Sequence, residues 1–297
     1  MLNISLNLAG RFRLKKIKKG RDVYVGEWFK NIITDNGLNL IPNSDTKFWY
    51  CCAGAGSDTP LNTDIAIQSF LGGSPASTGG DEGLNTSENY SYIRKVYQFD
   101  VGAVVGNVSE LTIGPNANGS NIFSRSLVKD QQGVPTSISV LADEQLIVEW
   151  EYRVYQPVTD FSGSVDGFSY VMRACNINSP FFWGSLSSQL QYVTSSGNSQ
   201  NTASAFVGGS LGSVSSAPSG TRFDRSQITV AGYVTNSFSL SASISWNPSS
   251  FSGEVTCFRY SLTSGFGTWQ FSIDPGINKT LDDKVEVDVS ISWSRDL

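Results

Sequence analysis

The sequence predicts an all-β protein built from two tandem antiparallel β-sandwich domains, with one or two short helices in the first. Three observations predict it. The 297-residue chain is only 16% charged and rich in glycine, serine and asparagine, which suits short strands joined by turns. Two segments alternate apolar and polar residues, as half-buried strands do. Landmarks of the first half also recur in the second, which indicates a duplicated unit.

The N-terminal stretch LNLAGRFRL (6–14) is the first expected strand. Its alternating apolar residues should face the core on either side of Gly10; they are Leu6, Leu8, Phe12 and Leu14. The opposite face carries basic side chains that continue past the strand into an expected loop. The seven basic residues of RFRLKKIKKGR (11–21) are Arg11, Arg13, Lys15, Lys16, Lys18, Lys19 and Arg21.

This basic run is the first candidate contact site. In a chain of formal net charge −5, a dense positive patch is best interpreted as a docking surface for an acidic partner, including a second copy. A solvated loop is the next interpretation. A nucleic-acid site is the last, because the chain as a whole lacks the basic excess that phosphate contacts require. We therefore expect residues 11–21 to contact another subunit or protein, and no nucleic acid.

Two short helices are expected in the first half. Thr34 or Asp35 is placed to cap DNGLNLI (35–41), and Thr63 is placed to cap DIAIQSFLG (64–72). Neither segment is long enough to form a layer of its own. The helices are therefore expected to decorate a β-domain.

The segment LADEQLIVEWEYRVY (141–155) is the clearest strand. Its inner face should carry Trp150 and Tyr152, and its outer, solvated face Glu149, Glu151 and Arg153. Two carboxylates at this spacing could serve a glycoside hydrolase. Nothing nearby suggests the apolar pocket that would raise the pKa of one of them, so we expect both to be exposed or paired with basic side chains, and the protein not to be an enzyme.

The C-terminal segment LDDKVEVDVSISWS (281–294) repeats this pattern, with Trp293 on the inner face and Glu286 and Asp288 outside. Both segments begin L-x-D. The domains are expected to span residues 1–157 and 158–297. Three further pairs of segments support the duplication: FSRSL (123–127) with FRYSL (258–262), YIRKVYQFDVGAV (92–104) with YVTNSFSLSASIS (233–245), and WYCCAG (49–54) with VMRACN (171–176).

Two long segments, 54–89 and 184–220, should leave the two domains at equivalent places, and loops of this length tend to be functional. Beside the second lies SPFFWG (179–184), whose consecutive Phe181, Phe182 and Trp183 cannot all face one core. These three aromatic residues are the second candidate contact site, for a subunit or a ligand.

Several kinds of site are not expected. The chain has no histidine, the commonest general base and zinc ligand. GAGSDTP (54–60) lacks the lysine of a phosphate loop, so a turn is the simpler interpretation. The acidic pairs lack the ligand spacing of a calcium loop, and we expect no metal or cofactor. We expect no signal peptide or membrane span, and four reduced cysteines: Cys51, Cys52, Cys175 and Cys257.

The first 155 residues resemble a group of virion structural proteins of tailed bacteriophages, found among tail, neck and tail-fibre gene products. The resemblance lies in NIITDNGLNLI (31–41), GAGSDTP (54–60), NVSELTIG (107–114) and the continuous stretch 121–155. It implies a non-enzymatic building block of the particle, assembled in the bacterial host cytoplasm into the virion. Its partners would be further copies of itself and other tail or neck proteins. The alternative is a receptor-binding tail-fibre or tail-tip module, whose long loops contact host glycan or protein.

Overall fold

The computed structural model describes residues 2–85, 87–156, 159–175, 203–262 and 266–296. The fold is nearly all-β, with 58% of residues in strands and 2% in helix. Its elements up to residue 127 are β1 (Leu2–Lys18), β2 (Arg21–Val25), β3 (Phe29–Lys30), β4 (Ile32–Ile33), α1 (Asp35–Leu40), β5 (Tyr50–Gly54), β6 (Phe70–Asn85), β7 (Tyr90–Gln98), β8 (Gly106–Val108), β9 (Glu110–Gly114) and β10 (Ser124–Leu127).

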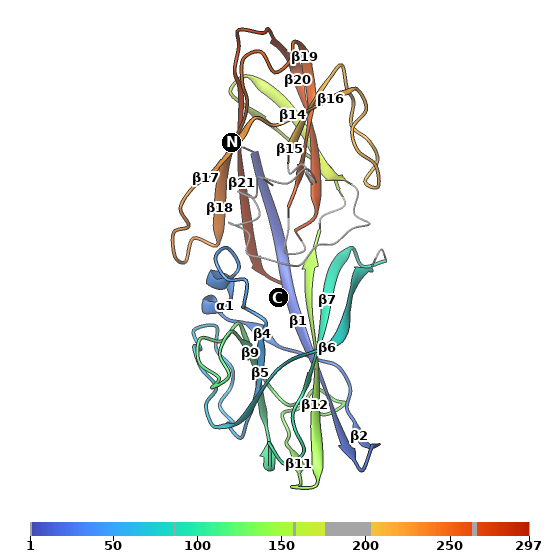
Figure 1. Ribbon diagram of the computed structural model, residues 1–297, viewed down its shortest axis with the longest axis vertical. Coiled ribbons are helices and arrows are strands. Elements are labelled where there is room, and N and C mark those ends of the chain that lie inside the picture. The colour runs from blue at the N-terminus through green and yellow to red at the C-terminus, as the bar shows by residue number, and fades with distance from the viewer. Residues whose placement is uncertain (1, 86, 157–158, 176–202, 263–265, 297) are drawn as a thin grey trace. The chain divides into compact units, whose positions relative to one another are not determined.

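The later elements of Figure 1 are also strands. They are β11 (Ile138–Val140), β12 (Glu144–Tyr155), β13 (Phe161–Val165), β14 (Phe168–Cys175), β15 (Ala203–Val207), β16 (Thr221–Asp224), β17 (Gln227–Val230), β18 (Ser239–Trp246), β19 (Gly253–Ser261), β20 (Thr268–Lys279) and β21 (Val285–Arg295).

The chain divides into two compact units. Unit 1 comprises residues 1–6, 83–91 and 154–293, and unit 2 comprises residues 7–82, 92–153 and 294–297. Each unit thus takes most of one expected half. The division differs from a single cut near residue 157 because short segments of each half belong to the other half's unit.

Unit 1 contains two sheets that share an aromatic core. One is six-stranded, in the order β13-β14-β20-β19-β15-β16, and the other contains β17, β18 and β21 beside the first residues of β1. Trp246 of β18 meets Phe258 of β19 with ring centroids 5.3 Å apart, and Phe258 stacks on Phe271 of β20. All three rings are buried, so large aromatic side chains fill the space between the sheets.

Unit 2 is built on one large sheet, in the order β1-β12-β7-β6-β5-β9-β10-β4, with β2 and β3 also paired to β1. Strands β8 and β11 form a separate pair. The segment 29–33 connects β1 with β10, because β3 pairs with β1 and β4 pairs with β10. The enclosed core contains four aromatic rings in mutual contact, those of Phe48, Phe123, Trp150 and Tyr152.

The alternation of β1 is confirmed. Its residues Leu6, Leu8, Phe12 and Leu14 are buried, while the residues between them are less so, apart from Gly10. The helix capped by Thr34 is also confirmed, since its hydroxyl accepts a hydrogen bond from the Gly37 N–H at 2.9 Å.

The second expected helix, over 64–72, is wrong. Ala66 forms an isolated bridge with Ser120, and Phe70 begins the long strand β6. Strand β6 pairs with β5, so contacts with a distant segment override a weak local signal for a helix. Much of the expected loop 54–89 is therefore strand.

Candidate functional site

The basic run lies on β1 and on the hairpin that β1 forms with β2. The hairpin turns through Lys19 and Gly20, both of which have positive φ, at 50° and 76°. Positive φ at both central residues is typical of the tight two-residue turn that matches strand twist. The register pairs Lys18 with Arg21 and Lys15 with Val25. The second part of the run is therefore a hairpin, where the sequence suggested a loop.

Most of these cations are paired with acidic side chains of the same chain, on or just before the neighbouring strand β12. The Arg13 Nε donates to Glu149 Oε2 at 2.7 Å, and the Lys15 ammonium lies 2.5 Å from the other oxygen of that carboxylate. Further along the strand, Lys16 pairs with Glu144 at 3.0 Å and Lys18 with Asp143 at 2.8 Å.

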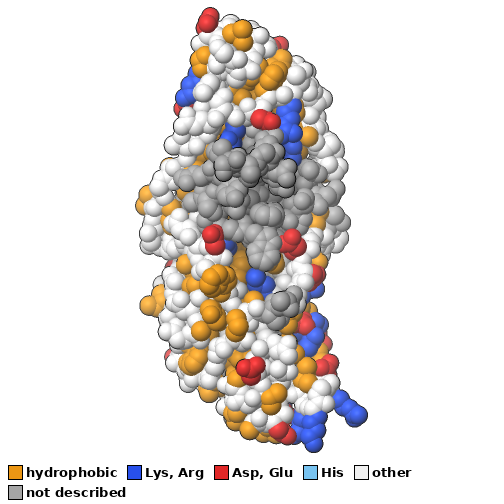
Figure 2. Space-filling model, in the orientation of Figure 1, with side chains coloured by type: hydrophobic (Ala, Val, Ile, Leu, Met, Phe, Trp, Pro, Cys, Tyr) orange, Lys and Arg blue, Asp and Glu red, His pale blue; other side chains and the backbone are white. Residues whose placement is uncertain are grey.

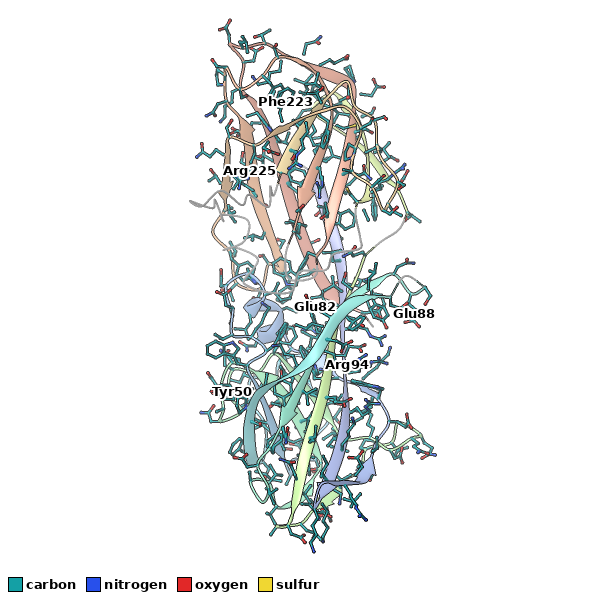
Figure 3. All side chains as sticks on the ribbon, turned by 45° about the vertical axis from the view of Figure 1, so that its right-hand side comes forward. Tyr50, Glu82, Glu88, Arg94, Phe223 and Arg225 are labelled. Carbon is teal, nitrogen blue, oxygen red and sulfur yellow. The ribbon has the colours of Figure 1, made fainter. Side chains whose placement is uncertain are left out.

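Glu151 is the centre of this network. Its carboxylate accepts hydrogen bonds from Arg11 at 3.0 Å, from Arg94 of β7 at 2.7 Å and from Arg153 at 2.7 Å. Arg94, labelled in Figure 3, also donates to Asp81 at 3.1 Å. Three guanidinium groups thus converge on one carboxylate.

The outer face of β12 is consequently not solvated, and that part of the sequence interpretation is wrong. Glu149 is 7% exposed and Glu151 only 1%. Burial alone would raise the pKa of each carboxyl. Hydrogen bonds from the surrounding lysine and arginine side chains outweigh burial, and the pKa of both groups is lowered. Both therefore stay ionised, as the expected pairing with basic side chains requires.

Trp28 lies over the same network. Its ring centroid is 4.4 Å from the Arg11 guanidinium carbon, 4.9 Å from that of Arg13 and 5.5 Å from that of Arg94. Contacts of this kind stabilise by about 0.5–1 kcal/mol each at exposed sites. The only signal for this contact in the sequence is the tryptophan itself, seven residues after the basic run.

The tip of the hairpin differs from the rest of the run. Lys19 and Arg21 are exposed, and in the part of the chain that the structure describes neither forms an ion pair. Among the described strands, β2 pairs with β1 alone, which leaves its other edge without a strand partner there, and Val23 and Val25 are half exposed. Figure 2 shows Lys and Arg side chains gathered at the end of the view where Figure 1 places β2.

A second ionic cluster, which sequence reasoning missed, organises GAGSDTP (54–60). The buried Glu110 carboxylate accepts hydrogen bonds from the backbone N–H groups of Gly56 at 2.9 Å and Ser69 at 2.7 Å. Arg125 donates to Glu110 at 3.0 Å and to Asp64 at 2.7 Å. A Cβ at residue 56 would lie 2.2 Å from the Glu110 carboxylate, so any larger residue would displace that carboxylate. The glycine-rich turn thus holds an anion, and that anion is the protein's own glutamate.

Phe181, Phe182 and Trp183 lie outside the described residues. The four cysteines are buried free thiols. Among the residues that the structure describes, no group of three or more acidic or cysteine side chains could hold a metal ion. No helix within the described ranges is long and apolar enough to cross a membrane.

Comparisons with known proteins give no relative. No protein-family model, curated protein sequence or solved structure matches the chain.

Proposed function

We propose that the protein is a non-enzymatic structural component of a tailed-phage particle, in the tail, neck or collar, and that it assembles into a homo-oligomer within the virion. The resemblance of residues 1–155 to virion structural proteins supports the proposal. The all-β fold suits a mechanical role, since sheets with aromatic cores act as rigid bodies. Closed rotational symmetry is the usual arrangement of such self-association.

The observation that carries the proposal is the hairpin tip. The cations on β1 are neutralised within the chain, whereas Lys19 and Arg21 are exposed and form no ion pair among the described residues, and no described strand other than β1 pairs with β2. An exposed strand edge can accept another strand, and unpaired cations favour an acidic partner. The exposed Glu286 and Asp288 of β21 give a second copy the charge that such a contact requires.

We further infer that the two units are tandem β-sandwiches derived from one duplicated unit. Strands β12 and β21 support this inference, because each lies between β1 and a strand from the matched segments 92–104 and 233–245, namely β7 and β18. Two differences count against a simple repeat. The matched segment of the second half begins at Tyr233, but its strand β18 begins only at Ser239. In addition, β10 and β19 come from matched segments, but β10 pairs with a strand that precedes it in the chain, β9, whereas β19 pairs with one that follows it, β20.

The experiment that tests the proposed contact replaces Lys19 and Arg21 together with Gln. Self-association and assembly with tail or neck proteins are measured by analytical ultracentrifugation at low and high salt. We expect weaker association and a smaller salt dependence, with little change in the unfolding midpoint, because both side chains are exposed and neither forms an ion pair among the described residues.

The matched control replaces Lys30 and Lys129 with Gln, which removes the same charge from two other side chains that form no ion pair among the described residues. We expect this control to associate as the unmodified protein does. Unchanged association and salt dependence in the Lys19 and Arg21 variant would contradict the proposed contact. An unmodified protein that stays monomeric and binds no virion protein would contradict the proposed function.

A further inference from the structure

A cleft of about 490 Å³ opens in unit 2 where the segment 29–33 passes between β1 and β10. The pairing of β10 with β4 ends at Arg125. Ser126 and Leu127 therefore have no partner on β4, and both line the cleft. The volume lies within the range of about 300–1,000 Å³ that is usual for small-molecule sites.

The walls of the cleft are largely apolar. Side chains from separate parts of the chain contribute to them, including Leu8 of β1, Ile32 of β4, Leu127 of β10, and the loop residues Pro60 and Pro135. An apolar wall of this kind favours a ligand with a hydrocarbon body, because burial removes its surface from water.

The charges around the cleft are unbalanced. Four cations line it, namely Lys30, Arg125, Lys129 and Arg295, against the single carboxylate of Asp296. The two arginines have internal partners: Arg125 binds Asp64 and Glu110, and Arg295 binds Asp35 and the Ile33 carbonyl.

The two lysines are different. Among the described residues, neither Lys30 nor Lys129 forms an ion pair, although Asp296 lines the same cleft. Lys30 is exposed and Lys129 half-buried, so solvent reaches both side chains. Two unpaired cations beside an apolar wall are complementary to one kind of ligand, an anionic group on an apolar body.

We infer that this cleft binds a small organic acid, with its carboxylate held by Lys30 and Lys129 and its apolar body against Leu127 and the two prolines. This site is separate from the contact proposed for the hairpin tip. Its occupancy therefore does not depend on whether the protein belongs to a virion.

The test uses 4-phenylbutanoate as the probe, with 4-phenylbutanamide as its neutral counterpart and inorganic phosphate as an anion without an apolar body. Dissociation constants are measured by titration NMR on the full chain. We expect the carboxylate to bind at least about tenfold more tightly than either comparison compound, which corresponds to about 1.4 kcal/mol.

Replacing Lys30 and Lys129 together with Gln should weaken carboxylate binding about tenfold or more, and each single replacement should have an intermediate effect. The variant lacking Lys19 and Arg21 is the matched control, because it loses two unpaired cations outside the cleft, and it should bind as the unmodified protein does. Equal binding of acid and amide, equal binding of phosphate, or unchanged affinity in the double lysine variant would each overturn the inference.

Discussion

Strands β12 and β21 share the same alternation of apolar and polar residues but differ in how exposed their outer faces are. Both alternate apolar and polar residues, both lie beside β1, and both bury a tryptophan on the inner face, Trp150 and Trp293. On the outer face, the side chain of Glu151 is 1% exposed and that of Glu286 is 48% exposed. The inner faces are thus alike, and the outer faces are not.

The residues of the neighbouring strands account for the difference. Glu286 lies opposite Ser245 of β18, whose short side chain covers it little. Beside β12, strand β1 carries Arg11 and Arg13, whose long side chains lie across the glutamates. The environment of an outward carboxylate is therefore set by the neighbouring strand, and alternation within its own strand does not reveal it.

The largest expected difference between the two strands comes from neutralising one carboxylate on each. Glu151→Gln leaves three arginines without their shared anion. We expect it to lower the free energy of unfolding by about 2–3 kcal/mol, below the value for a fully buried pair because the arginines are partly exposed. Glu286→Gln should cause no measurable change, since its partner Lys284 is also exposed. Urea unfolding at low ionic strength measures both.

Glu149→Gln serves as a second variant within the same network, with two cations on the carboxylate in place of three, and should cause a smaller loss than Glu151→Gln. Equal stabilities for the Glu151 and Glu286 variants would mean that burial beneath cations has no energetic consequence. The distinction drawn between the two strands would then be wrong.

A smaller effect should appear in the dependence of stability on pH. The pKa of Glu151 is lower in the folded protein than the ordinary value of 4.5, so the folded state binds fewer protons than the unfolded state. Its contribution is full above about pH 4.5 and is lost as the pH falls through the lowered pKa. Urea midpoints measured from pH 7 downward should therefore fall less steeply below pH 4.5 in Glu151→Gln than in the unmodified protein. A parallel decline in the two proteins would contradict the assignment.

The inner faces of the long strands could be predicted from the sequence. Alternation alone identified the buried inner-face residues of β1 and β12 and most of those of β21, and the Thr34 cap marked the one described helix. These signals are local, because each depends on residues within one segment. The pairing of distant segments has no comparable local signal.

The ionic clusters could not be predicted for that reason. Glu151 and Arg11 are 140 residues apart, and the sheet order that brings β1 beside β12 cannot be predicted from the residues of either strand. The Glu110 cluster joins three segments in the same way, and the helix expected over 64–72 is wrong because Asp64 and Phe70 serve such distant contacts. The β1–β2 hairpin, in contrast, is predictable from the sequence, since Lys19 and Gly20 separate two alternating segments as a two-residue turn does.

The most direct test of the central claim, that cations of β1 pair with the outer carboxylates of β12, is a pair of double-mutant cycles. One combines Arg13→Gln with Glu149→Gln, and the other combines Lys284→Gln with Glu286→Gln, each followed by urea unfolding at low salt. We expect a coupling of about 1 kcal/mol for Arg13 with Glu149, near the upper end for partly exposed pairs, because the carboxylate is buried. We expect no measurable coupling for Lys284 with Glu286. Absent coupling between Arg13 and Glu149, or equal coupling in the two cycles, would contradict the claim.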